Sequence, residues 1–154
     1  MSKAEQFANQ WMMHRSVLLD ILDRVDDKNF DFRPWSKAMT LGELAQHIAG
    51  AGALFINTAK TGQFSRPEGQ PVVTSMAELR QFLKDSTDSG YATIKSMTDE
   101  EFDGPVTSEH ILPDGTPASV WLSAMKDHEV HHKGQMFVYA RMTGVEEMPN
   151  FVQH

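Results

Sequence analysis

The sequence contains no cysteine. Disulfide bonds, cysteine-ligated zinc and a cysteine nucleophile are therefore excluded. Any metal site in this chain must be built from histidine and carboxylate side chains. A reaction that consumes a thiol would need that thiol to come from a cosubstrate.

Long apolar segments are also missing. The most apolar run, IAGAGALFI at residues 48–56, is too short to span a bilayer. The amino-terminal stretch MSKAEQFANQWMMHR has polar residues throughout and no apolar signal core. We therefore expect a cytoplasmic protein that has no membrane partner.

The chain has no basic cluster. It carries 14 Lys and Arg residues against 21 Asp and Glu, a net charge of −7, and the basic residues are scattered. This distribution argues against binding to nucleic acid. A length of 154 residues with 40 % hydrophobic content is typical of one globular domain, which we expect to comprise residues 1–154.

Apolar residues recur with a helical period in the first half of the chain. Residues 2–25 carry an apolar stripe with a 3.6-residue period, which predicts a long amphipathic helix. A second helix is expected from Thr40, because Thr40 and Glu43 have the spacing of a capping box, to about residue 62.

Two more helices are predicted in the second half. Ser75 and Glu78 repeat the capping spacing at the start of a helix that extends towards residue 97. The last helix is expected to begin with Thr116 as its N-cap and Pro117 at its first helical position, and to end at Gly144.

The predicted fold class is all-α, a four-helix bundle. Turn-forming segments separate the predicted helices, and GPVTSEHILPDG, residues 104–115, fits either a small hairpin or an irregular loop. The loop GQFSRPEGQPVVT is longer than a tight antiparallel connection needs, so a crossover between the second and third helices is compatible with it.

Three of the seven histidines fall in the stretch KDHEVHHKGQM, residues 126–136. His128 and His132 are four residues apart, so a helix places both rings on one face, close enough to share an ion. At about 100° per residue, that face is also the apolar one, and inward imidazoles need a partner such as a metal. His131 lies roughly 60° to 100° away, near the edge of the face, where it either supports a ligand or faces solvent.

A catalytic metal site usually has three protein ligands and one open position, so a third histidine is needed. His47 lies at the edge of the apolar stripe of its predicted helix, beside Leu44 and Ala51. His14 lies near the middle of the apolar face of the first helix. Helical geometry leaves His47 and His14 about equal as candidates.

Several motifs together resemble the DinB-like (DinB/YfiT) family of metalloenzymes. They are AQHI early in the second helix after an RPW turn, HEVHHKGQM in the last helix, and the closing TGVEEMPNF. The second is similar to the family pattern H-x-x-x-H-[RK]-G-Q, with Lys133 where Arg is more common. The resemblance implies that His47, His128 and His132 bind the metal, which favours His47 over His14.

The resemblance also implies a four-helix bundle that is commonly a homodimer and binds a divalent ion such as zinc or nickel. Some relatives transfer low-molecular-weight thiols (bacillithiol, mycothiol or glutathione) or are thiol-dependent isomerases, and many have no established activity. We therefore expect a metal-dependent transferase that activates a thiol cosubstrate for attack on a small electrophilic substrate. Gln135, one turn beyond His132, is a candidate for hydrogen bonding to a ligand.

Two other functions fit the same sequence. A metal-dependent hydrolase of a small substrate would need a general base, for which Glu129, next to His128, is the candidate. A metal-binding or stress-response protein without turnover would need only the ion.

Overall fold

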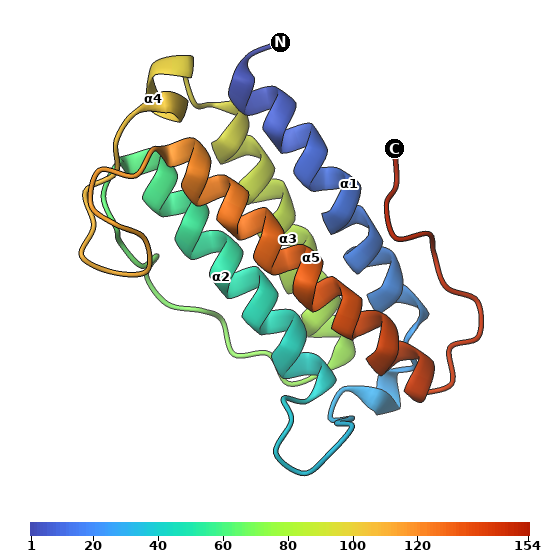
Figure 1. The fold of residues 1–154 in the computed structure, drawn as a ribbon. Helices are drawn as coiled ribbons and strands as arrows, with labels where there is room; N and C mark the ends of the chain where they lie inside the picture. Colours follow the sequence, from blue (N-terminus) through green and yellow to red (C-terminus); the bar gives the residue numbers. More distant parts are fainter.

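The computed structural model describes residues 1–154, and four long helices packed side by side make up most of it (Figure 1). They are α1 (Lys3–Arg24), α2 (Leu41–Thr61), α3 (Met76–Lys95) and α5 (Ala118–Met142). A short 3₁₀ helix, Asp27–Asn29, follows α1, and the short helix α4, Asp99–Asp103, precedes α5. The structure has no strands, which confirms the all-α prediction. None of its helices has the length and apolar character needed to cross a membrane.

The four long helices form a square in which α1 and α2 occupy opposite corners. Each of them packs against both α3 and α5. Helices α2 and α3 run in the same direction, opposite to α1 and α5 (Figure 1). Residues 62–75 therefore return along the length of the bundle between α2 and α3, which is the crossover that the loop length allowed.

The helix starts follow the local capping chemistry. The Thr40 side chain accepts from the backbone N–H of Glu43, and the Glu43 carboxylate accepts from that of Thr40, so the predicted capping box is present. Ser75 caps α3 as expected. The predicted start of α5 is wrong by one residue: Pro117 is the N-cap, and the Thr116 hydroxyl donates to Pro113 O at 2.6 Å instead of capping the helix.

The connection before α5 is an irregular loop. Only isolated bridges occur there, between Gln63 and Thr107 and between Pro105 and Pro117. Helix α4 was not predicted, although its N-cap Thr98 and Glu101 have the same capping-box spacing that identified α2. Five residues are too few for an apolar period to be visible.

A buried polar layer divides the core into two apolar clusters. One cluster contains Val17, Leu44 and Leu83, and the other contains Trp11, Leu54 and Ile94. Arg15 from α1 and Glu129 from α5 lie between them, each 1 % exposed, and form a two-pronged ion pair. The Arg15 Nε donates to Glu129 Oε2 at 2.6 Å, and Nη2 donates to Oε1 at 2.7 Å.

Two further hydrogen bonds extend the polar layer. Trp11 Nε1 donates to Glu129 Oε1 at 2.9 Å, and Arg15 Nη1 donates to the Thr87 hydroxyl at 3.1 Å. A Cβ atom at Gly52 of α2 would lie 3.2 Å from Arg15 Nη2, so glycine leaves the room that the guanidinium needs. The layer thus joins α1, α3 and α5 and rests against α2.

Candidate metal centre

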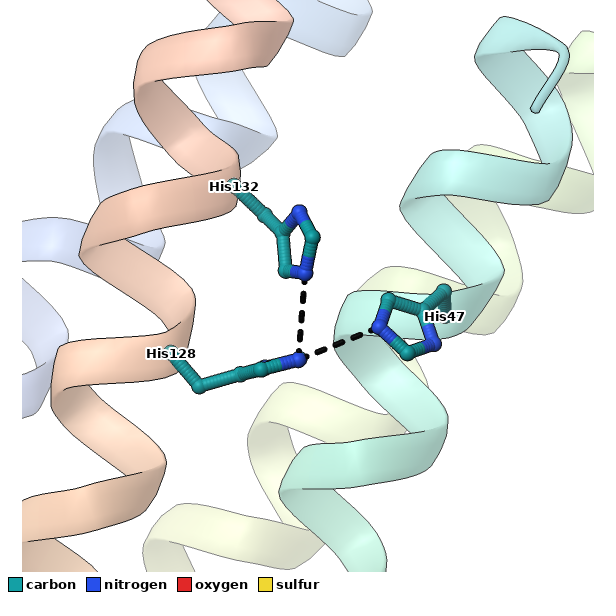
Figure 2. Close-up of side chains that lie close together, drawn as sticks. All are labelled: His47, His128 and His132. Carbon is teal, nitrogen blue, oxygen red and sulfur yellow. Dashed lines mark hydrogen bonds between the residues drawn. The ribbon is translucent and has the colours of Figure 1, made fainter. Parts of the chain in front are cut away.

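Three histidine rings from two helices converge at one point (Figure 2). His128 and His132 project from α5, one turn apart, and His47 projects from α2 opposite them. The Nε2 atom of His128 lies 3.1 Å from the Nε2 atoms of both His47 and His132. Candidate ligand atoms of all three lie within 4.8 Å of one another. The structure therefore brings together the three predicted metal ligands.

The hydrogen-bond partner of His132 determines which of its ring nitrogens carries the proton. Gln135 Oε1 lies 2.7 Å from His132 Nδ1, and an amide oxygen only accepts hydrogen bonds. The Nδ1 atom is therefore the donor, and in the neutral ring Nε2 presents its lone pair to the cluster. Gln135, proposed from the sequence as a contact for a ligand, hydrogen-bonds the His132 ring in the structure, an arrangement that is common around metal-binding histidines.

Hydrogen bonding among the rings alone cannot satisfy the cluster. Because His132 Nε2 is an acceptor, the contact with His128 needs the proton on His128 Nε2. The contact between His128 and His47 then requires that same proton or leaves two N–H groups facing each other. A cation at the centre would be shared by all three lone pairs.

The spacing also suits a metal ion. Zinc binds imidazole nitrogen at about 2.0–2.1 Å in tetrahedral geometry, which places two ligand nitrogens roughly 3.3 Å apart. The two 3.1 Å separations are close to that value. Three histidines on rigid helices leave the fourth position for a non-protein ligand. The donor set and its spacing thus fit a divalent ion.

The environment keeps two of the rings in the neutral form that can bind a metal. Burial, with the nearby His132 and His47 rings contributing, lowers the pKa of His128 to about 4. Burial, with His132 contributing, also lowers the pKa of His47. At neutral pH these rings therefore present lone pairs and not positive charges.

The other histidines do not join the cluster. His14 Nδ1 lies 2.9 Å from Lys133 Nζ, and that amine also donates to the Phe151 carbonyl oxygen near the carboxyl terminus. His131 is exposed, with its ring centroid 4.7 Å from that of His132. Sequence geometry left His14 and His47 equal, and the packing of the helices separates them.

Glu129 is wrongly placed for the general base that the hydrolase interpretation required. Its carboxylate is buried and receives three hydrogen bonds from Arg15 and Trp11. The site instead borders the Glu43 carboxylate, whose pKa is lowered chiefly by the hydrogen bond from the Thr40 backbone N–H. A carboxylate held in its ionised form by a helix cap is a weak proton acceptor.

A pocket of about 480 Å³ lies beside His47 on the α2 side of the cluster. This volume is in the usual range for small-molecule sites. Its walls come from α2 and from the segments before and after it: Met39, Glu43, Gln46, His47, Gly50, Ala51, Leu54, Arg66 and Gln70. Arg66 and Gln70 were not predicted from the sequence. They lie in the loop GQFSRPEGQPVVT, and its composition does not indicate which helix face the loop covers.

Comparison with known proteins extends over nearly the whole chain. The sequence profile of the DinB family matches residues 1–151. The chain is 26 % identical over 153 residues to the uncharacterized protein YjoA of Bacillus subtilis (strain 168), covering 99 % of each chain. The crystal structure of YjoA, a DinB-like protein, has a TM-score of 0.87 and covers 97 % of this chain and 99 % of that one. A DinB-like protein from Bacillus cereus ATCC 10987, 22 % identical, shares the fold with a TM-score of 0.76 over 94 % of each chain.

Proposed function

The chain belongs to the DinB family, and from this premise we propose that it is a metal-dependent transferase that activates a low-molecular-weight thiol for attack on an electrophile. His47, His128 and His132 would hold the divalent ion, for which zinc and nickel are the expected candidates. The observation that carries the proposal is the convergence of three ring nitrogens, beside an open pocket, whose contacts no arrangement of ring protons satisfies.

The chemistry requires an acidified thiol and a place to hold it. Three neutral ligands leave a bound divalent ion its full charge, which would lower the pKa of a coordinated thiol from its usual value near 8.5. Gln135 keeps the His132 lone pair directed at the centre. Ala51 and Leu54 provide an apolar wall against which a small organic molecule can lie. The attacking sulfur must belong to the cosubstrate, because the chain has no cysteine.

Metal-dependent hydrolysis of a small substrate has weaker support. The Glu129 carboxylate is buried and paired with Arg15, and the Glu43 carboxylate takes part in the capping box of α2. Glu129 is buried and fully engaged by Arg15 and Trp11, and the lowered pKa of Glu43 makes it a weak proton acceptor for a nucleophilic water. A thiol whose pKa is lowered by the ion needs no such base.

Two measurements test the proposal. Elemental analysis of protein purified without an affinity tag should find about one divalent ion per chain. Loaded protein should then accelerate consumption of monochlorobimane by added thiols, and His128→Ala should abolish the acceleration. Stoichiometric metal without acceleration by any thiol tested would argue for a binding or sensing role. Stoichiometric metal in His128→Ala would exclude the histidine centre.

A further inference from the structure

The pocket beside His47 contains a cationic side chain, Arg66, that forms no ion pair in the protein. Arg66 lines the pocket and forms none of the eight ion pairs of the structure. The only carboxylate of the lining, Glu43, accepts from the Thr40 backbone N–H and lies 3.6 Å from Arg33. A ligand in this pocket would therefore meet a guanidinium that no neighbouring carboxylate neutralises.

An aromatic stack supports Arg66. Its guanidinium carbon lies 5.7 Å from the centroid of the Phe64 ring, within the range of a cation–π contact. Phe64 in turn packs against Trp121, which is fully buried, with ring centroids 6.0 Å apart, and against His110 at 5.0 Å. The side chain on which Arg66 rests is thus anchored to the core, which reduces the entropy lost when the guanidinium binds a ligand.

The backbone just before Arg66 is also held in place. Phe64 N donates to Thr107 O at 2.8 Å, and Asn57 Nδ2 of α2 donates to the Ser65 hydroxyl at 2.8 Å. Arg66 therefore follows directly after a segment attached on one side to α2 and on the other to the loop before α5. Its position over the pocket results from these contacts.

The Gln70 side chain, from the crossover loop, lies directly against α2 in this pocket. A Cβ atom at Gly50, three residues after His47, would lie 2.1 Å from the Gln70 side-chain nitrogen. Glycine at this position lets the amide of Gln70 lie against the helix next to the histidine. Arg66 and Gln70 thus place polar groups from the crossover loop in the same pocket as the candidate ligand His47.

We propose that Arg66 binds the carboxylate of the low-molecular-weight thiol, so that the cosubstrate is an acidic thiol held between Arg66 and the histidine centre. This inference rests on the function proposed above. The planar guanidinium can form two parallel hydrogen bonds to a carboxylate, and Ala51 and Leu54 offer contact to the methylenes between the two ends. A neutral thiol would use only the histidine end.

The test compares matched ligands on cobalt(II)-loaded protein. Affinities for ω-mercapto carboxylates of increasing chain length, and for the ω-mercapto alcohols of the same length, are read from the visible spectrum of the cobalt centre. At the best length the carboxylate should bind about tenfold tighter than the alcohol, as a charge-assisted pair permits. Arg66→Gln should remove this preference and leave the affinity for the alcohol unchanged, while Arg66→Lys should retain part of it.

Arg141 provides the matched control. It is an exposed arginine of α5 whose guanidinium also stacks on a phenylalanine, 5.4 Å from the Phe137 centroid, but it lies outside the pocket. Arg141→Gln removes the same charge and should keep the preference for carboxylates. Equal preference in wild type and Arg66→Gln, or equal loss in both arginine variants, would overturn the assignment of Arg66.

A second ligand pair separates this inference from the thiol chemistry. Butyrohydroxamate and the monohydroxamate of succinate coordinate metals without a thiol and differ in one carboxylate. If thiols fail to bind but the hydroxamates show a preference that depends on Arg66, Arg66 is supported as a carboxylate-binding residue. The proposed thiol function is then wrong. Binding of thiols without any preference for the carboxylate leaves the proposed function intact and overturns the role of Arg66. Failure of all four ligand classes overturns both.

Discussion

Two polar clusters lie at neighbouring positions of α5 and differ in how completely their groups are paired. Glu129 faces Arg15, both are 1 % exposed, and both carboxylate oxygens accept hydrogen bonds. His128, the preceding residue, faces His132 and His47 across contacts that one proton cannot satisfy. The first cluster is complete within the protein, and the second needs a further component.

One face of α5 therefore carries the buried ion pair, and another carries the candidate metal ligands. Two adjacent residues on a helix point about 100° apart. The ion pair of Glu129 with Arg15 holds one face of α5 towards α1. The neighbouring position, His128, directs its imidazole towards His47 of α2. The polar groups around Glu129 satisfy one another, whereas the three imidazoles leave a contact that an added ion would satisfy.

The largest effect is expected from breaking the complete cluster. Glu129→Leu leaves the Arg15 charge buried without a partner and should lower the free energy of unfolding by about 3–5 kcal/mol in urea denaturation. The exposed pair Lys84–Asp88 is the control, and Asp88→Asn should cost less than about 1 kcal/mol. Recovery of most of the stability in Arg15→Met with Glu129→Leu would show that the isolated charge is the cause. A cost below 1 kcal/mol for Glu129→Leu alone would contradict this view of the layer.

Removing a ring from the incomplete cluster should affect metal binding much more than folding. His47→Gln and His132→Ala should each weaken metal affinity by more than about a hundredfold, beyond the effect typical of groups that only support a ligand. His14→Gln and His131→Ala should change it by less than about tenfold. Competition with a chromophoric chelator measures all four.

The same ring variants should remain helical by circular dichroism and melt only somewhat lower, because the two apolar clusters do not depend on the ion. Complete unfolding on chelation would make the ion structural. Normal binding in His47→Gln with weak binding in His14→Gln would move the site to the interface of α1 and α5.

A smaller effect is expected from the residue that orients His132. Gln135→Ala removes the acceptor at Nδ1 and should weaken metal affinity by about tenfold to a hundredfold. Gln135→Glu retains an acceptor and should preserve affinity. If the alanine variant binds metal normally, the hydrogen bond does not control the tautomer.

The smallest predicted effect is a pH dependence of the metal-free protein. Burial and the neighbouring rings lower the pKa of His128 to about 4, whereas an unfolded chain titrates near 6.5. The unfolded state therefore binds more protons between these values, and stability should fall as pH decreases from about 6.5 towards 4. Histidine NMR titration should show the low pKa, and His128→Gln should flatten that part of the stability profile. A ring that titrates near 6.5 would contradict the prediction.

The sequence was most informative where one helix contains the whole relationship. Thr40 and Glu43 mark the start of α2 because a capping box involves only local backbone groups. It was least informative where two segments meet. The buried role of Glu129 depends on Arg15, 114 residues away, and the place of Arg66 depends on a crossover loop whose path no local pattern specifies.

The sequence by itself determined four long helices and the pairing of His128 with His132, because a residue and its fourth neighbour share a face of any α-helix. Only the tertiary structure decided that His47, and not His14, completes the cluster. That choice depends on the order in which the helices pack and on their rotation about their own axes. Contacts across the whole core determine the packing order and the helix rotation. They include the Arg15–Glu129 ion pair between α1 and α5, and Gly52 of α2, which leaves room for the Arg15 guanidinium.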